Sequence, residues 1–438
     1  MKIEYPGNGR SRPYGIEKQI CSIIYNSVQL EIIRREVDQL YRAHFGKLVA
    51  FMLNSSAQLD SETAEDIVHD TFSSAIDHWN KNGLPTNTTG WVYKVCRNKA
   101  LNQLKNAKVA LEHSKKTIPI SEEIPFSESA IDDMQLKLLF ACAHPDLSPR
   151  VQVVITLKYV VNLRIDAIAK TLALSVAALD KLLVRARQQI KEENILLGEP
   201  HPSVLMARLP IVHKIIYLIF NEGYRSLSGK TILSEELCEE ALLLCKGILD
   251  GKYGNRDTEA LYALMLFNSA RFKSRFTKSG EILDLENQDR SLWNAGLITL
   301  GCEYLMKARV KEVSEYHLEA SVAYFHCRAS SIDLTDWNAI ANLYARLQRM
   351  RPNPFVELNY AIALYNSGKK DEAFPKLHAL EQRPFFSQYY LLNCCLGKLY
   401  RLEGKHLLAR NYYLKAIQQT AFEKERKFIQ HQIDELTY

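Results

Sequence analysis

Glycine and proline are scarce in this sequence, with 18 and 14 residues among 438. Architectures of many short strands need both residues at their turns, so the scarcity favours helices over a β-sandwich or barrel. No run of about 18 apolar residues is present, so no membrane-spanning helix is predicted. The first residues lack a long apolar stretch, which argues against a secretory signal, and we expect a cytoplasmic protein.

Patterns that bind metal or perform catalysis are also missing. The nine cysteines form no CxxC pair and do not stand with histidine at zinc spacing, so we expect reduced thiols, no metal and no cofactor. His144, His213 and His317 are isolated and are interpreted as packing or surface residues. No Ser/His/Asp set or carboxylate pair stands out, so the chain is not predicted to be an enzyme, although a triad scattered along the sequence would escape this test.

One stretch resembles a phosphate-binding loop only in part. NEGYRSLSGKT, residues 221–231, ends in Gly-Lys-Thr, but five residues separate Gly223 from Gly229 where such a loop needs four. We predict a structural loop between helices instead. Four of its residues are candidates for interdomain contacts: Asn221, Glu222, Gly223 and Tyr224.

The charge balance is mildly basic. A net charge of +6 and a pI near 8.6 permit nucleic-acid binding without requiring it. The length is enough for roughly two to four domains with hydrophobic cores of their own.

Helical spacing of the apolar residues predicts an all-α protein. Ser61 is expected to cap the helix SETAEDIVHDTFSSAIDHW. Residues 109–131 contain two prolines and four glutamates and have no strong periodicity, so they are interpreted as a linker. The predicted parts are an extension at 1–28, helical blocks at 29–108 and 132–193, a second linker at 194–208, and a helical domain at 209–438.

The last domain carries a weak internal repeat. Five residues recur after 36 positions: Ala361, Leu364, Gly368, Ala373 and Leu377 precede Gly397, Tyr400, Gly404, Ala409 and Tyr413. Small residues at helix contacts and a glycine at each turn are typical of TPR-like helical hairpins.

The stretch WVYKVCRNKALNQLK, residues 91–105, predicts an amphipathic helix. At 100° per residue, one side collects the apolar residues Val92, Tyr93, Cys96, Ala100 and Leu104. The other side carries Trp91, Lys94, Asn98, Asn102 and Lys105, with Arg97 at its edge. Cations suit phosphates, amides suit base edges and an aromatic ring suits stacking. A solvated basic face is the alternative.

Residues 153–191 have the pattern of a helix-turn-helix. One helix centres on 165–172, and Ser175 is expected to cap the next, with a buried stripe of Leu179, Leu182, Leu183, Ala186 and Ile190. This layout is typical of a recognition helix in the major groove, and a purely structural helical hairpin is the alternative.

The two blocks together resemble a bacterial sigma factor of the extracytoplasmic-function class. AEDIVHDTFSSAIDHW (64–79) is similar to region 2 of that family, and GWVYKVCRNKALNQLK (90–105) to its next helix, with the pattern W-x-x-x-x-A-R-N-x-A. DLSPRVQVVITLKYVVNLRIDAIAKTLALSVAALDKLLVRARQQIK (146–191) is similar to region 4. Cys96, Arg164 and Ala173 depart from the usual residues, which leaves the fold intact but puts the promoter sequence in doubt.

The C-terminal part resembles a long extension found in one sigma subgroup. The resemblance rests on IYLIFNEGY (216–224), ENQDRSLWN (286–294), YHLEASVAYFHC (316–327) and TDWNAIANLYARL (335–347). In that subgroup the extension is helical and TPR-like and takes the place of a separate anti-sigma factor. The resemblance therefore implies a regulatory domain, with a protein partner as a further candidate.

The resemblance also implies three sets of contacts. Residues expected to dock on the β′ clamp of core RNA polymerase are Asp66, His69, Asp70 and Phe72. Residues expected to hold the minus-ten element, with a flipped base taken by the loop, are Asn82, Thr86, Asn87, Thr88, Trp91, Lys94, Arg97, Asn98, Asn102 and Lys105. Region 4 is expected to meet the β flap and to read the minus-thirty-five element with Ser175, Val176, Ala177, Asp180, Lys181, Val184, Arg185 and Arg187.

A rival interpretation is a helix-turn-helix regulator on a TPR scaffold that does not engage polymerase. The helix AEDIVHDTF separates the two, because a plain repressor has no reason to carry it.

Overall fold

The computed structural model describes residues 14–55, 59–110, 128–172, 174–193, 195, 202–226, 233–251, 253–275, 277, 283–420 and 423–436. Side chains are described from Leu30 onward in the first helix and up to Leu104 in the third. Within these residues every regular element is a helix and none is a strand, which confirms the predicted all-α class. The chain divides into two compact units, Met1–Arg208 and Leu209–Tyr438.

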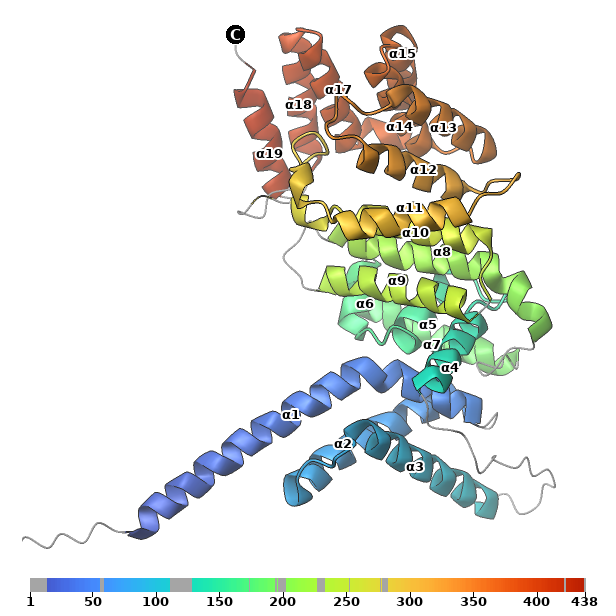
Figure 1. Cartoon of the computed structure of the whole chain (residues 1–438), viewed down its shortest axis with the longest axis vertical. Helices are drawn as coiled ribbons and strands as arrows, with labels where there is room; N and C mark the ends of the chain where they lie inside the picture. Colours follow the sequence, from blue (N-terminus) through green and yellow to red (C-terminus); the bar gives the residue numbers. More distant parts are fainter. Residues whose placement is uncertain are drawn as a thin grey trace, which may run out of the picture. The chain divides into compact units, whose positions relative to one another are not determined.

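The first unit contains two groups of helices, labelled in Figure 1. The first module comprises α1 (Tyr14–Ser55), α2 (Ser61–Asn82) and α3 (Thr88–Ala110). The second module comprises α4 (Glu128–Cys142), α5 (Pro149–Tyr159), α6 (Ile165–Thr171) and α7 (Val176–Glu192). Helices α2 and α3 lie side by side, and α1 contacts both α4 and α5.

Helix boundaries in this unit differ from the prediction at three places. Helix α1 already begins at Tyr14, inside the predicted extension. Asp60 rather than Ser61 caps α2, with its side chain accepting from the amide of Thr63 at 2.8 Å. Helix α4 begins at Glu128, inside the predicted linker 109–131, of which residues 111–127 lie outside the described residues.

The predicted helix-turn-helix is present as α6 and α7. Ser175 caps α7 and accepts from the amide of Ala178 at 3.2 Å, as predicted. Of the predicted stripe, Leu179, Leu183 and Ala186 are buried, whereas Leu182 and Ile190 are half-buried. Local capping and periodicity therefore account for this pair of helices.

The second unit is a succession of helices that pack on their neighbours in sequence. Helix α8 (Pro202–Ser226) begins inside the predicted linker, in the last residues of the first unit, and continues into the second. It is followed by α9 (Leu233–Asp250), α10 (Arg256–Ser269), the short 3₁₀ helices η1 (Phe272–Ser274) and η2 (Arg290–Leu292), α11 (Ala295–Lys307) and α12 (Glu315–Arg328). They are followed by α13 (Trp337–Met350), α14 (Pro354–Asn366), α15 (Lys370–Glu381), α16 (Pro384–Ser387), α17 (Tyr390–Leu402), α18 (His406–Gln419) and α19 (Glu423–Asp434).

Helix α8 is the most apolar of the long helices. Its stretch Val204–Tyr224 is long and apolar enough to cross a membrane by length and composition, although it contains no unbroken apolar run of that length, and 44% of its most apolar part is buried inside the protein. Leu209, Val212, Ile216 and Phe220 are fully buried at helical spacing. Packing in the second unit therefore explains the apolar residues of α8.

The internal repeat corresponds to two helical hairpins, α14–α15 and α17–α18. Gly368 and Gly404 lie at the matching turns and adopt φ of 86° and 70°, a conformation that favours glycine. Ala373 and Ala409, which also match, are both fully buried. Gly397 replaces Ala361 of the first hairpin because a Cβ there would lie 2.8 Å from the ring of Tyr413. The residues that recur are thus those that set the distance between paired helices.

Candidate nucleic-acid interface

The face of α3 agrees with the predicted helical wheel. Val92, Tyr93, Cys96, Ala100 and Leu104 are all buried, at 8% exposure or less. On the opposite side Lys94, Asn98 and Asn102 are exposed, and Trp91 and Arg97 are half-buried, while the side chain of Lys105 lies outside the described residues. Two amides one turn apart and a lysine therefore stand on an open surface of the first module.

Trp91 is held at the edge of this surface by aromatic neighbours. Its ring stacks on the ring of His78, with the ring centres 5.3 Å apart and the ring planes at 29°. It meets the ring of Trp79 edge-on, with the ring centres also 5.3 Å apart. A hollow beside it is lined by Ser74, Asp77, His78, Lys81, Trp91 and Val95. His78 is not among the residues predicted from the sequence. Its partner Trp91 lies on the next helix, and the residue spacing within α2 does not indicate a contact between helices.

Several side chains in and beside the loop before α3 form hydrogen bonds within the first module. The side chain of Asn87 accepts from the amide of Gly90 at 2.7 Å, and Thr88 donates to Glu36 of α1 at 2.9 Å. Asn82 donates to the carbonyl of His78 at 3.0 Å. Asn82, Thr86 and Asn87 remain exposed, whereas Thr88 is half-buried and ties the loop to the module.

The expected polymerase-binding set is split by the structure. Asp66, His69 and Asp70 are exposed on α2, and Lys99 of α3 forms an ion pair with Asp70. Phe72 is only 4% exposed and packs edge-on against Tyr41 at 5.1 Å. The prediction for Phe72 is therefore corrected: this ring belongs to the core, where it fixes α2 against α1.

The start of α7 offers an open surface. Ser175, Ala177, Asp180, Lys181 and Arg185 are exposed, and Val176 and Val184 are exposed at 48% and 58%. Arg187 differs, because it is half-buried and its Nε donates to the hydroxyl of Tyr159 at 3.2 Å. Arg187 is thus engaged by Tyr159 in this structure, and its role at the minus-thirty-five element stays a prediction.

Glu65 is the centre of the contact between the two modules. One carboxylate oxygen lies 3.1 Å from Nζ of Lys158 on α5, and the other lies 3.7 Å from Nη2 of Arg187 on α7. The hydroxyl of Tyr159 donates to the hydroxyl of Ser61, one turn before Glu65 on α2, at 3.4 Å. The Glu65 side chain is only 10% exposed, so two cations of the second module neutralise a nearly buried carboxylate of the first.

Backbone contacts reinforce this interface. A Cβ on Gly46 of α1 would lie 2.6 Å from the carbonyl oxygen of Val160, so only glycine permits the observed approach. Asn162, with φ of 58°, donates from its side chain to the carbonyl of Tyr41 at 3.4 Å. Burial, and then the charge of Glu65, raises the pKa of Tyr159 and keeps its hydroxyl protonated. The modules thus meet through ionic, polar and steric contacts at one place.

The candidate interdomain residues lie in α8 rather than in a loop, which corrects that prediction for Gly223. Gly223 is buried, and Asn221, Glu222 and Tyr224 are half-buried. The guanidinium of Arg275 lies 3.8 Å from the centre of the Tyr224 ring and donates to the Tyr224 carbonyl at 2.8 Å. These contacts of Tyr224 are internal to the second unit, and an interdomain role stays a prediction.

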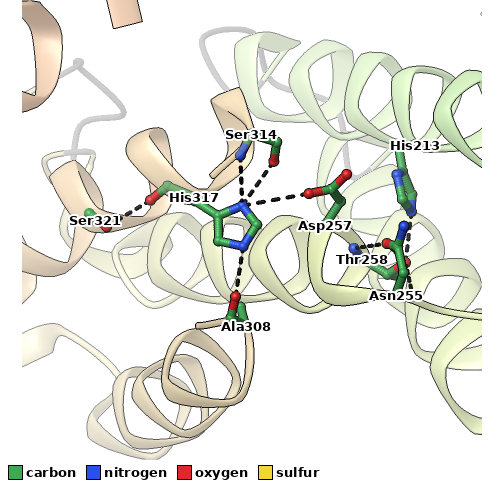
Figure 2. Close-up of polar contacts among 8 residues, drawn as sticks. All are labelled: His213, Asn255, Asp257, Thr258, Ala308, Ser314, His317 and Ser321. Atoms are coloured by element: carbon green, nitrogen blue, oxygen red, sulfur yellow. Dashed lines mark hydrogen bonds and ion pairs between the residues drawn. The ribbon is translucent and has the colours of Figure 1, made fainter. Parts of the chain in front are cut away.

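Figure 2 shows a serine, a histidine and an aspartate that the fold brings together. Nδ1 of His317 lies 2.9 Å from the hydroxyl of Ser314 and 3.6 Å from Asp257, while Nε2 lies 2.8 Å from the carbonyl oxygen of Ala308. A catalytic triad needs the serine and the acid on opposite ring nitrogens. Here both lie at Nδ1 and a carbonyl takes Nε2, so His317 joins the end of α11 to the start of α12.

His213, also in Figure 2, is a packing residue as predicted. It is 1% exposed, and its Nε2 lies 2.7 Å from the hydroxyl of Thr258. Burial lowers the pKa of His213 to about 4, so the ring is neutral near pH 7. No group of three metal-binding side chains occurs among the residues described.

Two family models match the chain. Residues 137–190, from α4 to α7, match sigma-70, region 4. Residues 208–309 match a family of unknown function, DUF6596. An uncharacterized protein, R00370, of Rhizobium meliloti (strain 1021) is 29% identical over 388 residues, which cover 86% of this chain and 90% of the relative. No solved structure matches. The region 4 match supports membership of the sigma-70 family and a DNA-binding role for this chain.

The Glu65 contacts make a prediction about local stability. Glu65→Gln removes the charge that Lys158 and Arg187 share, and the loss of one partner of a buried ion pair costs about 3 kcal/mol or more. We expect the amides of α5 in the full chain to exchange with deuterium at least ~10-fold faster, measured by mass spectrometry of peptides. Asp77→Asn makes the same charge change at an exposed position of α2 and should leave α5 unchanged. Equal exchange in wild type and Glu65→Gln would contradict this account of the interface.

Proposed function

We propose that this chain is a sigma factor of the extracytoplasmic-function class, which binds core RNA polymerase and directs promoter recognition and opening in the cytoplasm. The observation that carries the proposal is the region 4 match over 137–190, joined in one chain to the exposed amide and lysine face of α3. Promoter reading needs two separate DNA-binding surfaces, and the first unit offers one on each module.

The second module is proposed to read the minus-thirty-five element through the start of α7. Exposed Lys181 and Arg185 suit phosphates or guanine, and Asp180 suits a cytosine amino group. The exposed methyl groups of Val176 and Val184 suit the methyl group of thymine. Arg187 differs from these residues, because Tyr159 and Glu65 engage it while the modules are packed.

The first module is proposed to hold the minus-ten element. Asn98 and Asn102 lie one turn apart, so both amides can follow one strand along the axis of α3. Asn82 at the end of α2 and Thr86 and Asn87 in the following loop are exposed and are proposed to receive an unstacked base. The hollow beside Trp91 is lined by residues of α2 and α3, the helices that flank this loop. Unstacking costs a few kcal/mol, which contacts of this kind must offset.

Asp66, His69 and Asp70 are proposed to contact the β′ clamp, and the second module the β flap. Lys99 restrains Asp70 from α3, so the polymerase face and the DNA face are coupled through one ion pair.

In the second unit, TPR-like hairpins are proposed to control this activity, with a protein partner as their ligand. Removing residues 201–438 should change promoter-directed transcription, and equal activity of both forms under all conditions would remove the regulatory role.

The proposal predicts a separation of DNA opening from polymerase binding. Asn98→Ala with Asn102→Ala should abolish promoter opening, because both amides are lost from the face that meets the melted strand. Binding to core polymerase should remain, since Asp66, His69 and Asp70 are unchanged. Permanganate footprinting and run-off transcription measure opening, and co-purification measures binding.

A matched control lies on α13, where Asn338 and Asn342 are also exposed and one turn apart. Asn338→Ala with Asn342→Ala should transcribe as wild type does. Unchanged run-off transcription from the α3 double variant would rule out the assignment of the minus-ten face.

The packed modules set a further requirement for this function. Elements roughly 25 base pairs apart are separated by roughly 85 Å along B-DNA, at ~3.4 Å per base pair. The Glu65 cluster instead holds α2 in direct contact with α5 and α7. We therefore propose that the modules separate when both elements are bound.

Separation can be measured as a distance. Fluorophores on unnatural amino acids at Asn80 of α2 and Gln188 of α7, both exposed, avoid the native cysteines. Energy transfer should be high in the free chain and should fall when core polymerase and a promoter duplex are added together. A complex that forms on the promoter with undiminished transfer would exclude separation while leaving the sigma assignment standing.

A further inference from the structure

The segment ENQDRSLWN, residues 286–294, lies in the second unit and has no role in the proposed function. Asp289 caps η2 by accepting from the amide of Ser291 at 2.9 Å. The side chain of Asn294 caps α11 by accepting from the backbone amide of Leu297. The backbone amide of Asn294 donates to the carbonyl of Ala270 at 2.9 Å. Between these two caps, Arg290 and Trp293 lie against the ends of α12 and α10.

Two guanidinium groups gather on the indole of Trp293. The centre of the Arg290 guanidinium lies 4.7 Å from the ring and that of Arg271 lies 5.4 Å from it. Trp293 itself is 7% exposed, whereas both arginines remain partly open to solvent. The ring thus collects two positive charges whose side chains are half-buried.

Within the described part of the chain, no carboxylate pairs with these two guanidinium groups. Among the described residues neither arginine forms an ion pair, and Asp289 is turned to Ser291. Arg290 donates through Nη1 to the carbonyls of His326, at 2.6 Å, and Ala329, at the end of α12. Arg271 donates through Nε to Gln288 at 3.4 Å. Carbonyls and an amide supply partial negative charge, so the formal charge of the two guanidinium groups stays unpaired.

The surroundings respond to this excess of positive charge. Burial, followed by the nearby charge of Arg271, lowers the pKa of Arg290. Burial, and then Arg271 and Arg290, lowers the pKa of His326 to about 3, so its ring is neutral near pH 7. A neutral ring here can still donate or accept one hydrogen bond.

Three buried polar atoms of this cluster also find no hydrogen-bond partner among the residues that the structure describes: Nη2 of Arg290, Nε1 of Trp293 and Nδ1 of His326. Two of the three are obligate donors. A buried donor without a partner is costly, and native structures keep few of them. Buried donors beside two cations without an ion-pair partner favour binding of an acceptor that carries negative charge.

We propose that Arg271, Arg290, Trp293 and His326 form a binding site for the phosphoryl group of a small molecule. Guanidinium groups bind anions with several oxygens through paired charged hydrogen bonds. A phosphate ester carries a charge of about −1.5 to −2 at pH 7, which matches the two unpaired arginines better than a single carboxylate does. The guanidinium groups already cover the indole, so the site recognises the phosphoryl group and not a stacked base. This site does not depend on the sigma assignment.

The test uses the full chain and inorganic phosphate as the probe. Thermal unfolding is followed while sodium phosphate replaces sodium chloride at constant ionic strength and pH, with sulfate and acetate in parallel series. Phosphate and sulfate should raise the unfolding temperature in a saturable manner, and acetate should not. No specific rise with phosphate, or an equal rise with acetate, would overturn the proposal.

Variants locate the site. Arg271→Met should weaken phosphate binding at least ~10-fold, and Arg271→Lys, which keeps the charge but not the two-pronged donor, should fall between Arg271→Met and wild type. Arg328→Met removes an exposed charge from the end of α12, close in sequence to His326, and this variant should bind phosphate as wild type does. If Arg271→Met and wild type bind phosphate equally, the site is not at this cluster.

Discussion

The carboxylate of Glu65 is the constraint on which the first unit depends. A charged carboxylate that is only 10% exposed is unfavourable unless cations lie close by. The cations here, Lys158 and Arg187, come from α5 and α7 of the second module. The two cations therefore determine where α5 and α7 lie against α2. The close approach of Gly46 to Val160 leaves little freedom in that position.

This constraint separates the working surfaces from the packing surfaces. Neighbouring residues on a helix point about 100° apart, so Glu65 faces the interface while Asp66 faces solvent. On α7, Arg185 stays exposed while Arg187 turns to Tyr159. The residues proposed to contact DNA on α3 and α7, and those proposed to contact polymerase on α2, remain exposed while the modules are packed. What the packed form limits is the distance between the DNA faces rather than access to either of them.

Local pattern predicted much of this and failed where partners are distant in sequence. The α3 face and the cap at Ser175 depend on residues within one or two turns, so helical periodicity and capping rules were sufficient. Phe72 lies four residues after the buried Val68, and Arg187 four after the buried Leu183, so spacing alone could have placed both inward. The resemblance to a family outweighed that signal. No local pattern pairs Glu65 with Lys158, or His78 with Trp91, because these contacts depend on how whole helices pack.

The central claim is that this chain turns core RNA polymerase into an enzyme that initiates at chosen promoters. The most direct measurement reconstitutes the purified chain with core polymerase on genomic DNA and maps the 5′ ends of the transcripts. The account predicts a stable complex and starts at a discrete set of sites, each preceded by two shared elements with constant spacing. Failure to bind core polymerase, or starts that match those of core polymerase alone, would contradict it.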